Sequence, residues 1–156
     1  MYSSIHNAES ENTNVLQIRP LPDGKKYHVF ISYRDVDEDR IWIRQLILRL
    51  ENSYHFICCD HVVDFEPGHK IIENIKNAVT QSVKTVVILT KEYVESYWCD
   101  YELEYALLLN MDKKERILIP VLKEECKIPD YLLPFTYIDG RGEIDTWIHK
   151  LASNQK

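Results

Sequence analysis

One stretch of the chain, Ser82–Asn110, most constrains the fold. It opens with a run of β-branched and aliphatic residues, Thr85–Leu89, that polar residues flank. A continuous apolar run of this kind is typical of a strand buried on both faces. The chain then passes through a short segment that bears Tyr93 and Trp98, and continues into a Leu- and Ala-rich stretch. That stretch predicts a helix, whose apolar stripe consists of Cys99, Leu103, Ala106 and Leu107.

Glu102 lies on the margin of that predicted stripe. It comes three residues after Cys99 and four before Ala106, so it shares their side of the helix. A carboxylate in such a position is either an edge residue that reaches water or a charge held near a cleft. The position alone leaves both interpretations open.

Strand and helix patterns alternate along the rest of the chain. The other predicted strands are Tyr27–Tyr33, His55–Cys59, Ile117–Leu122 and Phe135–Ile138. Three further helices are predicted. The first is built on Ile43, Leu46, Ile47 and Leu50, and the others span Ile71–Ser82 and Ile144–Ala152. Asp35-Val36-Asp37 offers capping side chains for the first of these helices, and Glu38 and Asp39 favour its N-terminus. Pro120 cannot donate a ladder hydrogen bond, which suggests a sheet edge or a strand end. The alternation predicts a parallel α/β sheet with helices on both faces.

Length and charge indicate one globular domain with no nucleic-acid partner. Residues 1–24 are polar and aperiodic and predict a flexible lead-in, so the domain is expected to span residues 25–154 of the 156. The net charge of −6, without a long basic run, argues against nucleic acid. No apolar stretch is long enough for a membrane span, and the N-terminus lacks the apolar core of a signal peptide. We therefore expect a cytoplasmic protein that makes no membrane contact through this chain.

The residue patterns of common enzymes are absent from the sequence. The four glycines are too scattered for a dinucleotide or phosphate-binding loop, and neither GxSxG nor HExxH occurs. The four cysteines show no CxxC spacing. Cys58 and Cys59 are expected to point to opposite faces of a strand, so the run that ends at His61 is a weak metal signal, and no metal site is predicted.

Functional groups of a parallel sheet gather at the carboxyl ends of its strands. Here those ends are Tyr33–Asp35, Asp60–Gly68 and Thr90–Trp98, which hold the unusual residues of the sequence. A response-regulator receiver shares this topology, but it needs an acidic phosphoacceptor at the end of the third strand. Thr90 stands there instead.

Three stretches together resemble the TIR (Toll/interleukin-1 receptor) domain family. Tyr27–Tyr33 looks like its first box, Asp64–Gly68 like its BB loop, and Tyr93–Leu103 like its third-helix segment, with the Trp-Cys-x-x-Glu-Leu spacing intact. The chain departs from the family at His28, where Asp is frequent, and at Trp147, which remains alone of a Phe-Trp pair. The resemblance implies a flavodoxin-like fold with a five-stranded parallel sheet and helices on both faces.

The BB-loop stretch predicts a tight turn at a loop tip. Pro67 restricts its own φ, and Gly68 frees the next position. Val62, Val63 and Phe65 are apolar in a loop, where polar residues are expected, which favours a docking surface over a mere connection. The resemblance implies that Asp64, Phe65, Glu66, Pro67 and Gly68 form an interface with other TIR domains. Head-to-tail contacts of this kind would produce a concentration-dependent homo-oligomer or filament.

A second activity of TIR domains is the cleavage of NAD⁺. This reaction expels neutral nicotinamide from a cationic pyridinium, so it needs no general acid, unlike ordinary glycoside hydrolysis. By resemblance, Glu102 would be the catalytic carboxylate, Trp98 would stack on nicotinamide and Arg34 would contact phosphate. NAD⁺ would then be a substrate rather than a permanently bound cofactor. Alternatively, Glu102 is structural, Trp98 belongs to the core, and Arg34 pairs with Asp35 or Asp37.

The sequence therefore supports two functional hypotheses. The first is a TIR domain that mediates homotypic TIR–TIR assembly in innate-immune signal transduction. The alternative is an assembly-dependent NAD⁺ hydrolase or cyclase that releases nicotinamide.

Overall fold

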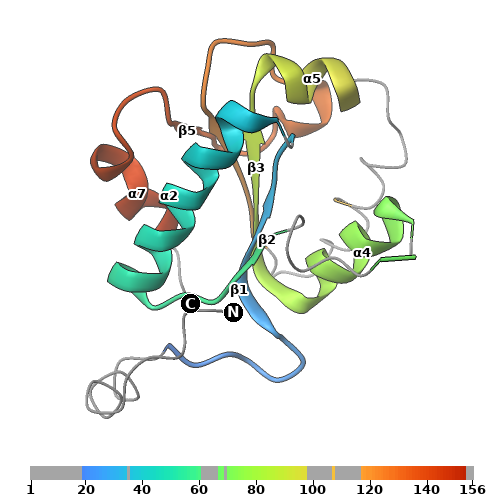
Figure 1. Ribbon diagram of the computed structural model, residues 1–156, viewed down its shortest axis with the longest axis vertical. Coiled ribbons are helices and arrows are strands. Elements are labelled where there is room, and N and C mark those ends of the chain that lie inside the picture. Colours follow the sequence, from blue (N-terminus) through green and yellow to red (C-terminus); the bar gives the residue numbers. More distant parts are fainter. Residues whose placement is uncertain are drawn as a thin grey trace.

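The protein folds around one parallel β-sheet with helices on both of its faces (Figure 1). A computed structural model describes residues 19–34, 36–60, 67–68, 70–97, 107 and 117–153. The strand order is β2-β1-β3-β4-β5, and each neighbouring pair is parallel. This is the flavodoxin-like topology that the sequence predicts.

The elements follow the expected alternation of strand and helix. The strands are β1 (Tyr27–Ser32), β2 (Cys58–Asp60), β3 (Ser82–Leu89), β4 (Ile117–Leu122) and β5 (Ile138–Asp139). The helices are α2 (Asp37–Tyr54), α4 (Ile71–Gln81), α5 (Lys91–Tyr97), the 3-10 turn η2 (Asp130–Leu132) and α7 (Ile144–Ala152). The bounds of β4 and α7 are those that the sequence predicts.

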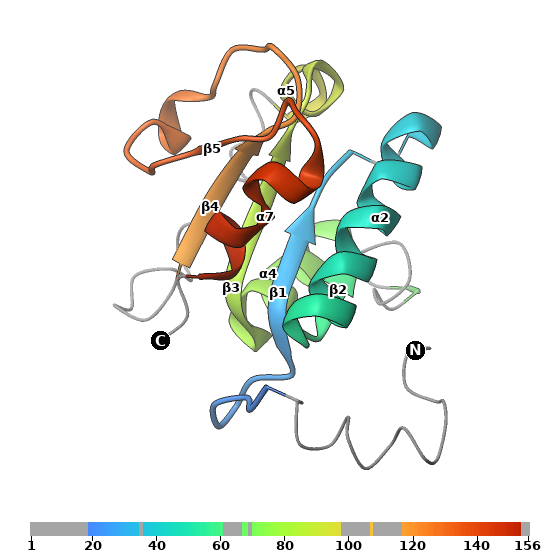
Figure 2. The ribbon, with the colours of Figure 1, turned by 90° about the vertical axis from the view of Figure 1, so that its left-hand side faces the viewer.

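Two hydrophobic cores lie on opposite faces of the sheet. Helices α2 and α7 cover one face, as Figure 2 shows, and α4 lies behind the sheet in that view. The first core joins Val29 and Ile31 of β1 to α2 and α7, whereas the second joins Phe30 of the same strand to α4 and α5. The alternation of side chains along each strand thus divides the apolar residues between the two faces.

Strand β2 is shorter than predicted and begins later. The sequence predicts a strand over His55–Cys59, but the structure places it at Cys58–Asp60. The cause is the end of α2, because His55 adopts a left-handed conformation with φ 61° and donates its N–H to the Glu51 carbonyl. Cys58 lies in the first core and Cys59 in the second, so they point to opposite faces as expected.

Strand β3 begins earlier than predicted. The sequence assigns Ser82 to the preceding helix, yet Ser82 is the first residue of β3 and follows Gln81, the last residue of α4. Ser82, Lys84 and Thr85 are polar, but each is about 1% exposed. The predicted run therefore misses the first three residues of the strand, which include the buried polar residues Ser82 and Lys84.

The prediction for Pro120 is wrong. It lies inside β4, which is flanked by β3 and β5, rather than at an edge or an end. Leu122 accepts a hydrogen bond from Gly140, so Pro120, two residues earlier, faces the same side of the strand. Strand β5 pairs only with Val121 and Leu122, and therefore the missing N–H of Pro120 breaks no ladder bond.

Further differences concern the segment after β3 and the start of the described chain. The short segment that follows β3 forms the helix α5, and of the predicted stripe beyond it only Leu107 is described, fully buried in the second core. Within the predicted lead-in, Arg19 Nε donates to the Tyr54 carbonyl at 3.1 Å, and the Pro20 carbonyl lies 3.0 Å from His28 Nε2. None of the helices in the described ranges is long and apolar enough to span a membrane.

Candidate functional site

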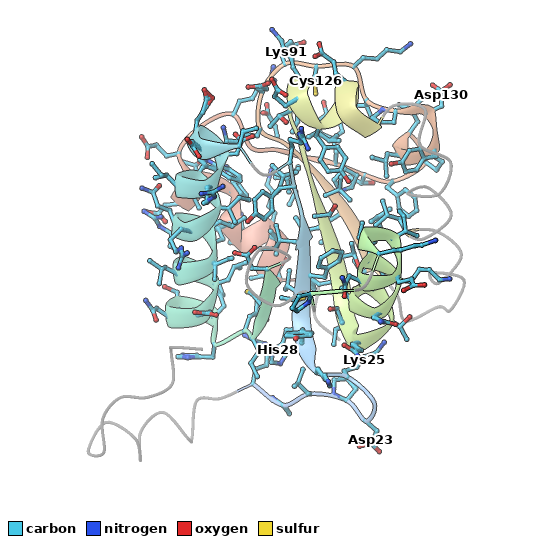
Figure 3. The ribbon with its side chains drawn as sticks, turned by 45° about the vertical axis from the view of Figure 1, so that its right-hand side comes forward. Asp23, Lys25, His28, Lys91, Cys126 and Asp130 are labelled. Carbon is cyan, nitrogen blue, oxygen red and sulfur yellow. The ribbon has the colours of Figure 1, made fainter. Side chains whose placement is uncertain are left out.

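The carboxyl ends of the strands form the edge at which the sequence predicts function. In Figure 3 this edge is the end of the molecule where Lys91 is labelled, opposite His28. Of the predicted site residues, the structure describes Arg34, Pro67 and Gly68. The others lie outside the described residues, namely Asp64, Phe65, Glu66, Trp98 and Glu102.

Two buried hydrogen bonds tie the end of β1 to its neighbours. Ser32 Oγ lies 2.9 Å from the Tyr93 hydroxyl of α5. The Tyr33 hydroxyl donates to Asp60 Oδ1 at the end of β2, at 2.7 Å. These contacts hold α5 and the end of β2 at defined distances from β1, so this edge of the sheet is rigid.

Arg34 follows directly and differs from these satisfied groups. Its Nε atom is buried, and no described residue accepts a hydrogen bond from it. The ion pair with Asp37 that the sequence allowed does not form, because Asp37 lies 3.8 Å from Arg40 instead; Asp35 lies outside the described residues. A buried guanidinium donor without a partner among the described residues is costly to maintain, so this atom can serve an incoming acceptor.

Thr90, which replaces the acidic residue of a receiver domain, has a structural role. Its hydroxyl accepts a hydrogen bond from the Tyr93 backbone N–H at 3.0 Å, and its carbonyl accepts one from Val94. Thr90 therefore caps the N-terminus of α5. A hydroxyl engaged in this way provides no phosphoacceptor carboxylate, which leaves the receiver hypothesis without support.

An ion pair that sequence reasoning missed lies at the same edge. Lys123, the residue after β4, places Nζ 3.1 Å from Asp39 Oδ1 of α2, and Nζ also lies 5.4 Å from the Trp42 ring centroid. The sequence predicts Asp39 only as a favourable first-turn residue, and it predicts capping side chains. In the structure the N-cap is Val36, which makes no side-chain cap bond, while Asp39 is buried against Lys123. Because the two partners are far apart in the sequence, no sequence pattern predicts this pair.

A second charged group, at the end of β5, is exposed. Arg141 contacts both Asp139 and Glu125, with Nε 2.8 Å from Asp139 Oδ1 and Nη1 2.6 Å from Glu125 Oε1. Hydrogen bonds from Arg141 lower the pKa of Asp139 to about 2. Because these side chains are solvated, the cluster has little bearing on stability and shapes only the charge of the rim.

The described tip of the BB loop is exposed. Pro67 and Gly68 form a turn, and Gly68 has φ +88°. A Cβ added at Gly68 would meet no atom within 4 Å. The glycine is therefore required by backbone conformation and not by close packing against the domain.

Comparison with known proteins identifies relatives over most of the chain. The family model described as the TIR domain matches residues 29–152. Toll-like receptor 2 of Mus musculus is 35% identical over 127 residues, which cover 72% of this chain and 16% of the receptor. Toll-like receptor 1 of Homo sapiens is 33% identical over 123 residues, covering 78% of this chain and 15% of the receptor. The chain thus spans about a sixth of the length of these receptors.

Solved structures show the same relationship. The TIR domain of the Toll-related receptor TRR-2 from Hydra magnipapillata aligns with a TM-score of 0.58 at 28% identity, covering 73% of this chain and 84% of that chain. A metazoan TIR-STING receptor from C. gigas aligns with a TM-score of 0.61 at 27% identity, covering 78% of this chain and 40% of that chain. The matched family model spans most of the chain, and the sheet order and the receptor relatives agree with it. The chain belongs to the TIR domain family.

Proposed function

We propose that this TIR domain acts in innate-immune signal transduction by assembling with other TIR domains, with the BB loop of residues 64–68 as a docking surface. Support comes from its family and from its similarity to Toll-like receptors and to a TIR-STING receptor. As part of the same proposal, the domain acts in the cytoplasm and assembles in a concentration-dependent manner.

The observation that carries this proposal is the environment of the loop tip. Pro67 and Gly68 are exposed, and the space around Gly68 is open. Packing does not require a glycine at position 68, yet the sequence restricts the backbone with Pro67 and permits the turn with Gly68. A preorganised, uncovered turn suits contact with another molecule, because little conformational entropy is lost on docking.

The chain offers a matched pair of glycines for the test. Gly24 and Gly68 have φ of +85° and +88°, and neither would place a Cβ within 4 Å of another atom. Gly68→Ala and Gly24→Ala should therefore lower stability by similar amounts, about 1 kcal/mol each. Only Gly68→Ala should reduce self-association, measured by light scattering over a concentration series. Equal loss of assembly in both variants would point to a general stability effect.

Two further variants test the loop directly. Pro67→His should abolish assembly while leaving the melting temperature nearly unchanged, because Pro67 is exposed. Phe65→Ala should weaken assembly by about 1–3 kcal/mol, as expected for an interface anchor. Light scattering unchanged by Phe65→Ala at high concentration would argue against the docking surface, and a matching drop in melting temperature for Pro67→His would make the loop structural.

A second candidate function, NAD⁺ cleavage, is favoured by one observation. The Nε atom of Arg34 is buried at the end of β1 without an acceptor among the described residues. A phosphate oxygen of a dinucleotide would satisfy this donor. In this proposal Glu102 is the carboxylate that stabilises the oxocarbenium-like transition state, Trp98 contacts nicotinamide, and assembly completes the site.

Nicotinamide release from NAD⁺ tests this second function. The purified chain is compared at low and very high protein concentration, with Glu102→Ala, with Arg34→Gln, and with Arg44→Gln as an exposed cation control. Release that rises steeply with concentration, disappears in Glu102→Ala and persists in Arg44→Gln would support an assembly-gated enzyme. No release from demonstrable filaments would leave Glu102 structural and the domain a scaffold.

A further inference from the structure

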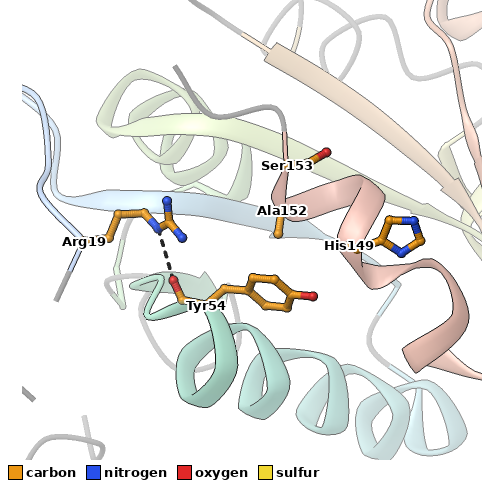
Figure 4. A pocket seen from close by; sticks show the side chains of 5 residues that line it. All are labelled: Arg19, Tyr54, His149, Ala152 and Ser153. Carbon is orange, nitrogen blue, oxygen red and sulfur yellow. Dashed lines mark hydrogen bonds between the residues drawn. The ribbon is translucent and has the colours of Figure 1, made fainter. Parts of the chain in front are cut away.

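The opposite end of the sheet holds a pocket that neither proposed function uses. It lies between the C-terminal ends of α2 and α7 and has a volume of about 340 Å³ (Figure 4). Its lining residues are Arg19, Tyr54, His149, Ala152 and Ser153. This pocket is at the amino ends of the strands, away from the carboxyl edge where Arg34 and the BB loop lie.

Arg19 is the cation that lines the pocket. Its Nε donates to the Tyr54 carbonyl at 3.1 Å, and its guanidinium carbon lies 4.8 Å from the Phe56 ring centroid. This geometry holds the guanidinium at the pocket while its two Nη atoms have no acceptor among the described residues. The two Nη groups of the Arg19 guanidinium are therefore able to donate a pair of hydrogen bonds to an oxyanion.

A second cation, Lys84, lies near the same aromatic ring. Its side chain is buried, its Nζ donates to the Leu151 carbonyl at 2.9 Å, and Nζ lies 5.6 Å from the Phe56 ring centroid. Burial, together with the charge of Arg19, lowers the pKa of Lys84 to about 8. At neutral pH both groups are charged, so they repel each other.

The local charges do not cancel. Each helix C-terminus carries about −0.5 of an elementary charge, so the ends of α2 and α7 together supply about −1 against the +2 of Arg19 and Lys84. No described carboxylate forms an ion pair with either cation. A surplus of about +1 remains beside an open pocket in a chain whose net charge is −6. An anion in the pocket would relieve this repulsion.

We propose that this pocket binds the phosphate of a small phosphomonoester, with the Arg19 guanidinium as the principal contact. His149 and the Tyr54 hydroxyl supply further donors at the wall. The Tyr54 ring and the Ala152 methyl group provide apolar surface for the organic part. The volume exceeds what inorganic phosphate alone would fill and is typical of a small-molecule site.

The full chain is titrated with two probes, inorganic phosphate and phenyl phosphate, in buffers of equal ionic strength, and backbone amide NMR shifts are recorded. Phenyl phosphate should bind more tightly, because its ring adds contact with Tyr54 and Ala152. Arg19→Gln should weaken its binding about tenfold or more, as expected for loss of charged hydrogen bonds. His149→Glu, on an exposed helix position, should weaken it by repulsion without disturbing the fold. Arg44→Gln, the control on the exposed face of α2, should have no effect.

Vesicles of phosphatidylcholine with phosphatidic acid, which has a phosphomonoester headgroup, form a second arm. Binding of both phenyl phosphate and the vesicles, with the same dependence on Arg19, would support the site and assign the phosphate to a lipid. Binding of phenyl phosphate without the vesicles would support the site and assign it to a soluble compound. No shift of amides around Arg19 and His149, or equal weakening by Arg44→Gln and Arg19→Gln, would overturn the proposal. Because these outcomes do not involve the BB loop or Glu102, they are independent of the proposed functions.

Discussion

The two ends of the sheet treat their charged and polar groups differently. At the carboxyl end, Lys123 pairs with Asp39 and the Tyr33 hydroxyl bonds to Asp60, and the buried Nε of Arg34 is the exception, because no described residue accepts a hydrogen bond from it. At the amino end, Arg19 and Lys84 bond to helix carbonyls. His28 completes that end, with Nδ1 accepting the Ile57 N–H at 2.8 Å and the ring stacked on Phe56.

This difference predicts that the contribution of the amino end to stability depends on pH and on bound anions, and that the contribution of the carboxyl end depends on them less. For an ion pair such as Asp39–Lys123, the free energy of unfolding falls mainly when one member is removed, because the other charge is then left without a counter-ion. A group of cations with only dipolar partners is sensitive to pH and to bound anions instead. The matched groups at the carboxyl end thus fix its geometry and leave the Arg34 Nε atom as a donor for an acceptor, whereas the amino end carries a net positive charge that a ligand can neutralise.

The largest expected loss of stability comes from removing one member of the Asp39–Lys123 ion pair at the carboxyl end. Asp39→Ala should destabilise the domain by about 2–4 kcal/mol, because Lys123 loses its buried counter-ion. Urea denaturation gives the value. The control is Asp37→Ala in the same helical turn, whose carboxylate is exposed and only 3.8 Å from Arg40, and it should change stability by less than about 1 kcal/mol. Similar losses in both variants would mean that Asp39 acts only on the helix dipole.

Tyr33→Phe should have a smaller effect at the same end. The substitution keeps the buried ring and removes the donor to Asp60 Oδ1, which costs about 1–3 kcal/mol because a carboxylate loses a hydrogen bond. Ser32→Ala removes the neutral Ser32–Tyr93 bond and should cost about 1 kcal/mol. Urea denaturation of both variants ranks them; the reverse order would show that the Asp60 contact adds little.

The pH dependence of stability tests the prediction that the amino end responds to protonation. Burial lowers the pKa of His28 below its ordinary value of 6.5, so below pH 6.5 the unfolded chain binds more protons than the folded one. Stability should therefore fall as the pH drops below 6.5. By the same logic Lys84, whose folded pKa is about 8 against 10.5, should add stability as the pH rises between those values.

Thermal melts between pH 5 and 10 measure both effects. His28→Asn should flatten the loss below pH 6.5, and Lys84→Met should remove the gain above pH 8. A wild-type melting temperature that stays constant from pH 6.5 to 5 would contradict the assignment for His28.

The smallest effect concerns the anchor of the segment before β1. Arg19→Gln should destabilise the domain by about 0.5–1 kcal/mol, because the Tyr54 carbonyl at the end of α2 loses a cationic donor and the Phe56 ring loses a cation–π contact. Differential scanning calorimetry compares it with Arg44→Gln, which should be neutral. A loss well above 1 kcal/mol would mean that residues 19–24 are an integral part of the fold.

Much of the fold could be predicted because apolar periodicity is a local signal. Strand β4 and helix α7 match the predicted bounds, because β4 is a short apolar run buried on both faces and α7 carries one apolar stripe at helical spacing. Errors occurred where the partner of a residue is distant in the chain. The left-handed turn at His55 shortened β2, and the short strand β5 allowed Pro120 inside β4.

The candidate site could be predicted only in part. The sequence placed Arg34 and the Pro67-Gly68 turn at strand ends, which parallel topology brings to one edge. The Asp39–Lys123 pair joins residues that are far apart in the chain, so no spacing rule reveals it. Lys84 was also missed, although it shares the strand parity of Val86 and Ile88 and so faces the same core.

The sequence by itself determined the layer architecture, the parallel sheet and the family, because hydrophobic alternation and short motifs are read from neighbours along the chain. The tertiary structure alone decided which charges meet. It set Asp39 against Lys123 at one end and gathered Arg19, His28 and Lys84 around Phe56 at the other. Electrostatic energy depends on distance in space and on burial, and both are set only when distant segments pack together.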